Sequence, residues 1–138
     1  MNLGYACINT ALSANKIFTN RTMRRKTFDA QGIDYVSDLA LLNVKDLKTI
    51  VQWNNEMKIK LFRLSSQIFP WSDEYDVKTL KDYDEISSRM REIGQIAKDG
   101  GQRLTMHPGP YNCLASPTQK VVEKTIRELN FHSEQFNM

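Results

Sequence analysis

Three short apolar runs, separated by longer amphipathic stretches, restrict most strongly the folds open to this chain. The runs are LGYACI (3–8), KLFRLSS (60–66) and RLTMH (103–107). Each is short and bounded by polar or turn residues, as is typical of buried strands. Strands that alternate with amphipathic helices form parallel β–α units. We therefore expect an α/β fold.

Two of the helices are predicted from apolar residues that recur at i, i+4, i+7 and i+11, which places them on one helix face. Two glycines after the second helix, in KDGGQR, predict its end. The predicted buried positions are Ala40, Val44, Leu47 and Val51 in the first helix, widened by Ile50 and Trp53, and Ile86, Met90, Ile93 and Ala97 in the second.

A third helix is predicted near the end of the chain. Ser116 offers a capping side chain, Pro117 suits the first helical position, and Gln119 completes a capping box. The apolar face expected to be buried comprises Val122, Ile126, Leu129 and Phe136.

Polar and aromatic residues follow each predicted strand. They are Asn9 and FTNRTMRR (18–25) after the first strand, PWSDEYD (70–76) after the second, and HPGPYN (107–112) after the third. No glycine-rich phosphate loop accompanies the strands. An open doubly wound sheet and part of a β/α barrel both remain possible. In either one these loops gather at the carboxyl ends of the strands, where active sites form.

Composition sets wider limits. With 138 residues the chain suits one domain, and its two cysteines suggest neither a disulfide framework nor a zinc ribbon. No stretch has the length of a membrane span and no secretory leader is recognisable, so we expect an intracellular protein without a membrane partner. The net charge of +3 does not decide for or against nucleic acid. The basic run at 21–26 is either a solvated loop or a set of phosphate contacts.

For three side chains we consider both a structural and a functional role. His107 ends the third predicted strand, and is a metal ligand, a general acid or base, or a polar group satisfied by a neighbouring loop. His132 lies near the end of the third helix, where a structural role is expected. Tyr111 follows Gly109-Pro110 and either covers the rim of the fold or stacks on a nucleic-acid base.

Four stretches in the same order, LGYACIN, FTNRTMRR, FRLSSQIFPW and RLTMHPGPYNCLASP, resemble the UV-damage endonucleases. The resemblance implies a β/α barrel related to apurinic-site endonucleases and to xylose isomerase. It also implies a DNA-repair enzyme that nicks damaged double-stranded DNA 5′ of UV photoproducts, using divalent ions. Manganese is expected, with magnesium or zinc as alternatives.

The resemblance also assigns roles to individual residues. His107 matches a metal ligand and is the predicted catalytic residue, and Tyr111 matches an aromatic side chain that inserts into the duplex. The predicted DNA- and lesion-binding set is Tyr5, Asn9, Asn20, Arg21, Arg24, Pro110 and Tyr111. Pro110 stands where the family usually has glutamine. Some members carry a metal-binding histidine in the loop after the second strand. In this chain only Asp73 or Glu74 could take its place there, and Glu74 is the further predicted metal ligand.

A complete β/α barrel needs about 250 residues. Residues 1–138 therefore match the first three β–α units, the N-terminal half of such a domain. We expect a truncated barrel, with little nuclease activity of its own, whose open sheet edges require the missing half or self-association. Two alternatives remain at this stage: a sugar isomerase or epimerase of the same barrel type, and a lesion-binding module without catalysis.

Overall fold

A computed structural model describes residues 2–138. Along the chain the elements are β1 (Gly4–Ala6), α1 (Thr10–Ser13), α2 (Arg25–Glu56), β2 (Leu61–Arg63), the 3-10 turn η1 (Val77–Thr79), α3 (Tyr83–Asp99), β3 (Arg103–Thr105) and α4 (Gln119–Phe136). The three strands form one parallel sheet in the order β1-β2-β3. The predicted alternation of parallel strands and helices is thus confirmed, although each strand is shorter than the apolar run that predicted it.

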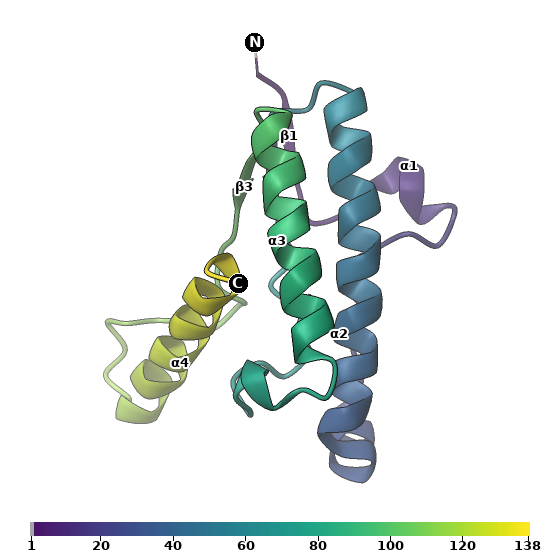
Figure 1. Cartoon of the computed structure of the whole chain (residues 1–138). Helices are drawn as coiled ribbons and strands as arrows, with labels where there is room; N and C mark the ends of the chain where they lie inside the picture. The colour runs from purple at the N-terminus through teal and green to yellow at the C-terminus, as the bar shows by residue number, and fades with distance from the viewer. Residues whose placement is uncertain (1) are drawn as a thin grey trace.

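One row of side chains crosses the sheet. Tyr5 pairs in register with Phe62, and Phe62 pairs with Leu104. Phe62 is completely buried. Helices α2 and α3 lie side by side and their buried residues join Phe62 in one core (Figure 1). Within residues 2–138, β1 and β3 each pair with β2 alone, so both leave an open edge.

Helix α2 begins well before the predicted position near Ala40. It starts at Arg25, so the end of the basic run is helical rather than a loop. Gly32 interrupts it with φ 68° and ψ −161°, a conformation that a residue without Cβ adopts at little cost. The predicted face of this helix is confirmed, since Ala40, Val44 and Leu47 are buried.

Helix α3 matches its prediction closely. All four predicted core residues (Ile86, Met90, Ile93 and Ala97) are buried. The helix ends at Asp99, directly before the two glycines. C=O groups at this end accept N–H groups of the turn that leads to β3: Ile96 O accepts from Gly100, and Ala97 O accepts from Gln102.

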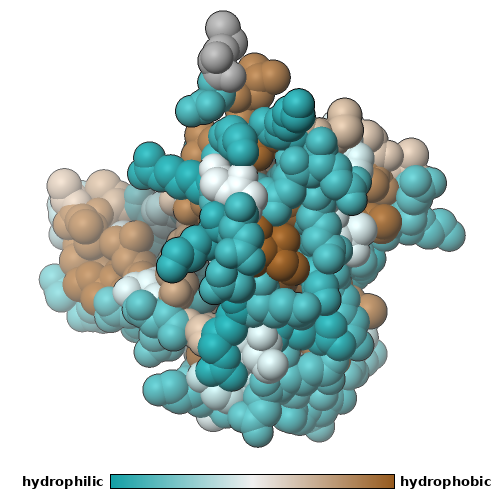
Figure 2. Space-filling model, turned by 45° about the horizontal axis from the view of Figure 1, so that its top comes forward, coloured by the Kyte–Doolittle hydropathy of each residue, from teal (hydrophilic) through white to brown (hydrophobic). Residues whose placement is uncertain are grey.

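Helix α4 corrects the sequence-based prediction in two ways. It begins at Gln119 after Thr118, with no side-chain cap, because the Ser116 hydroxyl accepts the Thr118 N–H in a turn before the helix. The predicted apolar face is largely exposed, with Phe136 at 49% and Ile126 at 45%. Apolar side chains accordingly gather at the surface on the side of the molecule where α4 lies (Figures 1 and 2).

The buried face of α4 is mainly polar. It comprises Thr125, Phe131, His132 and Gln135. Phe131 is its large apolar anchor, and packs edge-on against Phe69, at 5.3 Å between ring centroids, and Tyr75, at 6.1 Å. The helix itself was therefore predicted correctly. The prediction of which face is buried against the rest of residues 2–138 was wrong.

The two cysteines are free thiols, Cys7 partly buried after β1 and Cys113 exposed before α4. Cys7 adopts φ 61° at the point where the chain turns away from β1. Among residues 2–138, no helix combines the length and the apolarity that crossing a membrane requires.

Candidate functional site

The loops that follow the three strands meet at one pocket of about 230 Å³. Thr22 comes from the loop after β1, the segment 66–73 from the loop after β2, and Gly109 and Pro110 from the loop after β3. Glu128 of α4 completes the lining. The strand-end loops were predicted to gather on one face, and the pocket shows that they do.

Asn43 of α2 ties two of these loops together. Its Oδ1 accepts the Arg21 N–H at 3.0 Å, and its Nδ2 donates to Arg21 O at 3.1 Å and to Ile68 O at 3.0 Å. The side chain is fully buried, so these bonds replace the water that it has lost. Asn43 was not predicted from the sequence, although a polar residue beside Val44 on a buried helix face is a detectable exception.

The basic segment divides into engaged and free side chains. The Arg21 guanidinium pairs with Asp46 at 2.7 Å and donates to Phe18 O at 2.6 Å. Arg25 pairs with Asp29 and with Glu74, each at 2.9 Å. Both arginines therefore hold the protein's own loops.

Asn20 and Arg24 are exposed. Within residues 2–138 the structure gives neither side chain an ion pair or hydrogen bond. Arg24 thus remains available for a phosphate, and the predicted DNA contacts of the basic segment stay predictions.

The turn after β3 carries the two most specific predicted residues. His107 lies two residues beyond the end of β3 and is exposed, with Nδ1 beside Pro108 O. Tyr111 is 96% exposed. Its backbone has φ 70°, a left-handed conformation that is disfavoured for a bulky residue and persists where its surroundings fix it.

Glu128 of α4 lies under this turn. Its carboxylate accepts the Gly109 N–H and, at 2.7 Å, a hydrogen from Asn112 Nδ2. His132 Nε2 lies 3.5 Å from the same carboxylate, in a buried position that fits the structural role predicted for it. Neither Glu128 nor Asn112 was singled out from the sequence, because a glutamate in a helix of mixed charge is indistinguishable from a surface residue.

Tyr5 and Asn9 form a second polar group. Asn9 Nδ2 donates to the Tyr5 hydroxyl at 2.9 Å, and this hydroxyl donates to Asn54 Oδ1 at 2.6 Å. Asn54 Nδ2 in turn donates to Gln102 Oε1 at 2.9 Å. Burial raises the pKa of Tyr5, and its two hydrogen bonds oppose part of that shift.

This second group lies beside α1 and the C-terminal end of α2. Tyr5 and Asn9 line a pocket of about 350 Å³ together with Trp53 of α2. No hydrogen bond within residues 2–138 connects them to His107 or Tyr111. The structure thus brings Tyr5 and Asn9 together, and His107, Pro110 and Tyr111 together, but leaves the two groups separate.

The candidate metal ligands do not form a centre. Glu74 is paired with Arg25, and Asp73 with Lys124 at 3.1 Å. In the part of the chain that the structure describes, no three His, Cys, Asp or Glu side chains cluster as a metal site requires. The ligand roles of His107 and Glu74 stay predictions, and the two residues are too few to hold an ion by themselves.

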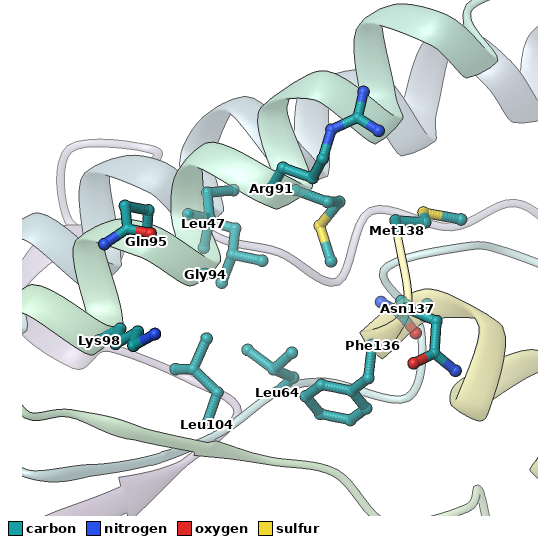
Figure 3. A pocket seen from close by; sticks show the side chains of 13 residues that line it. Leu47, Leu64, Arg91, Gly94, Gln95, Lys98, Leu104, Phe136, Asn137 and Met138 are labelled. Atoms are coloured by element: carbon teal, nitrogen blue, oxygen red, sulfur yellow. The ribbon is translucent and has the colours of Figure 1, made fainter.

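A further pocket of about 600 Å³ lies between α3, the sheet and the end of α4 (Figure 3). Leu64 and Leu104 lie on its sheet side, and Arg91 and Lys98 lie on its α3 side. Despite its size we do not assign function to it, because none of the predicted site residues lines it.

The fold and the pocket at its strand ends define a parallel α/β unit of the kind that binds ligands at the carboxyl ends of its strands. The family model "UV-endonuclease UvdE" matches residues 1–138. The chain therefore belongs to the UvdE family, as its motifs predicted.

Sequence and structural relatives support this assignment. The UV-damage endonuclease of Schizosaccharomyces pombe is 39% identical over 96% of this chain and 22% of its own length. A putative UV-damage endonuclease of Acanthamoeba polyphaga mimivirus is 39% identical over 100% of this chain and 42% of its own. The crystal structure of SacUVDE superposes with a TM-score of 0.86 at 27% identity, over 99% of this chain and 45% of that one. The chain thus spans less than half the length of these proteins.

Proposed function

We propose that this chain forms the N-terminal part of a DNA-repair endonuclease that nicks double-stranded DNA 5′ of UV photoproducts and related lesions. The observation that carries the proposal is the family match over residues 1–138. It favours an endonuclease over the sugar isomerase or epimerase that the barrel type alone allowed. We further propose that the three β–α units are part of a (β/α)8 barrel, whose closure would pair the open edges of β1 and β3.

In this proposal Tyr111 contacts the damaged duplex directly. Its side chain is almost completely exposed on a turn whose backbone is held by Glu128. An aromatic ring in that position stacks on a base or enters a weakened base step, which contributes about 1–3 kcal/mol per base. Pro110 cannot supply the amide that the family's usual glutamine has, so Tyr111 alone probes the duplex here.

Tyr5 and Asn9 are proposed to line the space for extruded nucleotides, and Asn20, Arg21 and Arg24 to face the phosphates. The structural support differs between the two arginines. Arg24 is exposed and unpaired within residues 2–138, whereas the Arg21 guanidinium is already paired with Asp46. We therefore expect Arg24 to carry more of the salt-dependent affinity for DNA than Arg21.

The family implies divalent metal ions, expected to be manganese, that activate water and stabilise the phosphodiester transition state. Residues 2–138 do not fit a complete centre, as described above. The residue that suits a ligand role is His107, because a hydrogen bond from Nδ1 to Pro108 O would leave Nε2 as the metal-binding nitrogen. With one ligand, the isolated chain is expected to have little or no nuclease activity.

Two assays with the purified chain test the proposal. The first measures binding to a fluorescent duplex that carries one UV photoproduct, compared with the undamaged duplex. We expect preferential binding of the damaged duplex, lost in Tyr111→Ala and retained in His107→Ala. Equal binding of both duplexes by the wild-type chain would contradict the proposal.

The second assay follows nicking of UV-irradiated plasmid with manganese. Robust nicking by residues 1–138 alone would overturn the expectation that this part is inactive. A lesion-binding module without catalysis predicts the same binding results. Metal-dependent incision by a longer chain that contains these residues, abolished by His107→Ala, would exclude that alternative.

A further inference from the structure

The position of Tyr111 depends on a turn that has no regular secondary structure of its own. Residues 107–112 lie between β3 and α4 and bond to few other parts of the protein. Tyr111 occupies the left-handed region at φ 70°. For a residue with a large side chain, that conformation requires support from outside the residue.

Glu128 contacts the turn on both sides of Tyr111. One carboxylate oxygen accepts the backbone N–H of Gly109, and the other accepts from Asn112 Nδ2 at 2.7 Å. Asn112 Nδ2 also donates to Gly109 O at 2.8 Å, which closes the turn on itself. Tyr111 therefore lies between two residues that are bound to the same carboxylate.

The setting of Glu128 makes these bonds strong. Its side chain is only 13% exposed, so little water competes for the carboxylate. Hydrogen bonds to an ionised acceptor are roughly twice as strong as bonds between neutral groups. Gly109 also lies so close that a Cβ added there would stand 3.1 Å from Glu128 Oε1. A larger residue at this position would therefore displace the carboxylate by a few tenths of an ångström.

We propose that Glu128 is a positioning residue that fixes the turn 107–112 and thereby presents Tyr111 to the duplex. Glu128 does not touch DNA in this proposal. It acts through the Gly109 N–H and the Asn112 side chain, and its link to DNA binding rests on the proposed function. The buried ring of His132 stands behind the carboxylate at 3.5 Å and limits the positions that it can adopt.

Glu128→Gln tests the proposal with little change in shape. Glutamine keeps one acceptor for Gly109 but places an NH₂ group against the NH₂ of Asn112, so one bond is lost and the other loses its charge. Amide hydrogen exchange by NMR should show Gly109 exchanging about tenfold faster, because that is the effect of removing about 1.4 kcal/mol of protection. The backbone order parameter of Tyr111 should fall.

Glu123→Gln is the matched control, since Glu123 lies on the exposed side of the same helix and, among residues 2–138, its side chain bonds only to Gln119. It should leave both signals unchanged. Unchanged Gly109 exchange and Tyr111 order in a folded Glu128→Gln variant would overturn the proposal. If that variant does not fold, Asn112→Ala decides in its place, because it removes one of the two anchors and leaves the helix intact.

A duplex-binding measurement then separates this proposal from the proposed function. Glu128→Gln should reduce the preference for the UV-damaged over the undamaged duplex about tenfold, whereas Glu123→Gln should retain it. A wild-type chain without any preference would contradict the proposed function and leave the NMR result standing. A Glu128→Gln variant that has a disordered turn but full preference would overturn the role of Glu128 in presenting Tyr111.

Discussion

Helices α3 and α4 have similarly amphipathic sequences but opposite relations to the rest of the protein. In α3 the apolar stripe, including Ile86 and Ile93, faces α2 and the sheet. In α4 a mainly polar face with Phe131 at its centre is buried, and apolar residues such as Ile126 and Leu129 are exposed. A hydrophobic period therefore indicates a helix and its apolar side, but not whether residues 2–138 cover that side.

The sharpest test of this comparison uses two phenylalanines of α4 itself. Phe131→Ala should cost about 3–5 kcal/mol, because it removes the buried ring that packs on Phe69 and Tyr75. Phe136→Ala should cost less than about 1 kcal/mol, since that ring is 49% exposed. Urea unfolding followed by circular dichroism measures both changes. Similar losses for the two variants would mean that α4 buries its apolar face in solution.

The buried amide side chains of α2 and of α4 offer a second contrast. Asn54→Ala should cost about 1–3 kcal/mol, because it leaves the Tyr5 hydroxyl and Gln102 Oε1 without their partner. Gln135 of α4 is equally buried but its Nε2 has no partner within residues 2–138. Gln135→Met should therefore be neutral or stabilise the chain by up to about 1 kcal/mol.

Exposed Gln52→Ala is the control for Asn54→Ala and should change stability by less than about 0.5 kcal/mol. The same urea titration serves for all three variants. A clear loss of stability in Gln135→Met would show that the Gln135 amide has a hydrogen-bond partner in solution. The buried amide of α4 would then resemble the bonded amide of Asn54 in α2.

These contrasts also explain which elements of the fold could be predicted from the sequence. The buried face of α2 and the whole of α3 were predictable, because each buries its apolar residues within residues 2–138. The strands were located by their apolar runs although only part of each run is buried, since Leu3, Ile8 and Leu61 are exposed. The start of α2 was not predicted, because Gly32 interrupts the helix with a non-helical conformation, although the buried Val36 extends the apolar face before Ala40. The orientation of α4 was not predictable either, since it depends on Phe131 and on polar contacts of residues distant in sequence.

The candidate site shows the same division. His107 and Tyr111 were identified through motifs that stand in one continuous stretch, and the convergence of the strand-end loops follows from parallel topology. Asn43 and Glu128, which hold these loops, were not identified. Their roles arise from contacts with residues about 20 positions away, which the sequence does not reveal. Of the two, Asn43 alone stands out in the sequence, as a polar residue on a buried helix face.

The pH dependence of stability provides a third test, through the contact between Tyr75 and Phe131. The Tyr75 hydroxyl donates to Pro70 O at 2.9 Å, and burial raises its pKa well above the ordinary value of 10, with a smaller contribution from Asp73. Above pH 10 the unfolded chain loses this proton while the folded chain keeps it. Stability should therefore fall as the pH rises, by up to about 1.4 kcal/mol per pH unit.

Urea unfolding at several values between pH 9 and pH 11 measures this slope. Tyr75→Phe should reduce it, and the remainder should reflect Tyr5 and Lys81, whose pKa values are also raised, by burial and by the bond to Asp38 respectively. Phe131→Ala should reduce it as well, because Tyr75 then loses its cover. The control is Tyr111→Phe, which alters an exposed tyrosine. An unchanged slope in Tyr75→Phe would contradict the burial of this hydroxyl.

The smallest expected effects concern the ion pairs that bridge each helix to its neighbour. Lys48 of α2 pairs with Glu92 of α3 at 2.6 Å, and Lys124 of α4 pairs with Asp73 at 3.1 Å. All four side chains retain some solvent contact, and exposed pairs of this kind contribute about 0.2–1 kcal/mol. Lys48→Gln and Lys124→Gln should each cost no more than that, and the cost should shrink in 1 M salt. If α4 were held chiefly by its charges rather than by Phe131, Lys124→Gln would cost several times more than Lys48→Gln and the difference would disappear in salt.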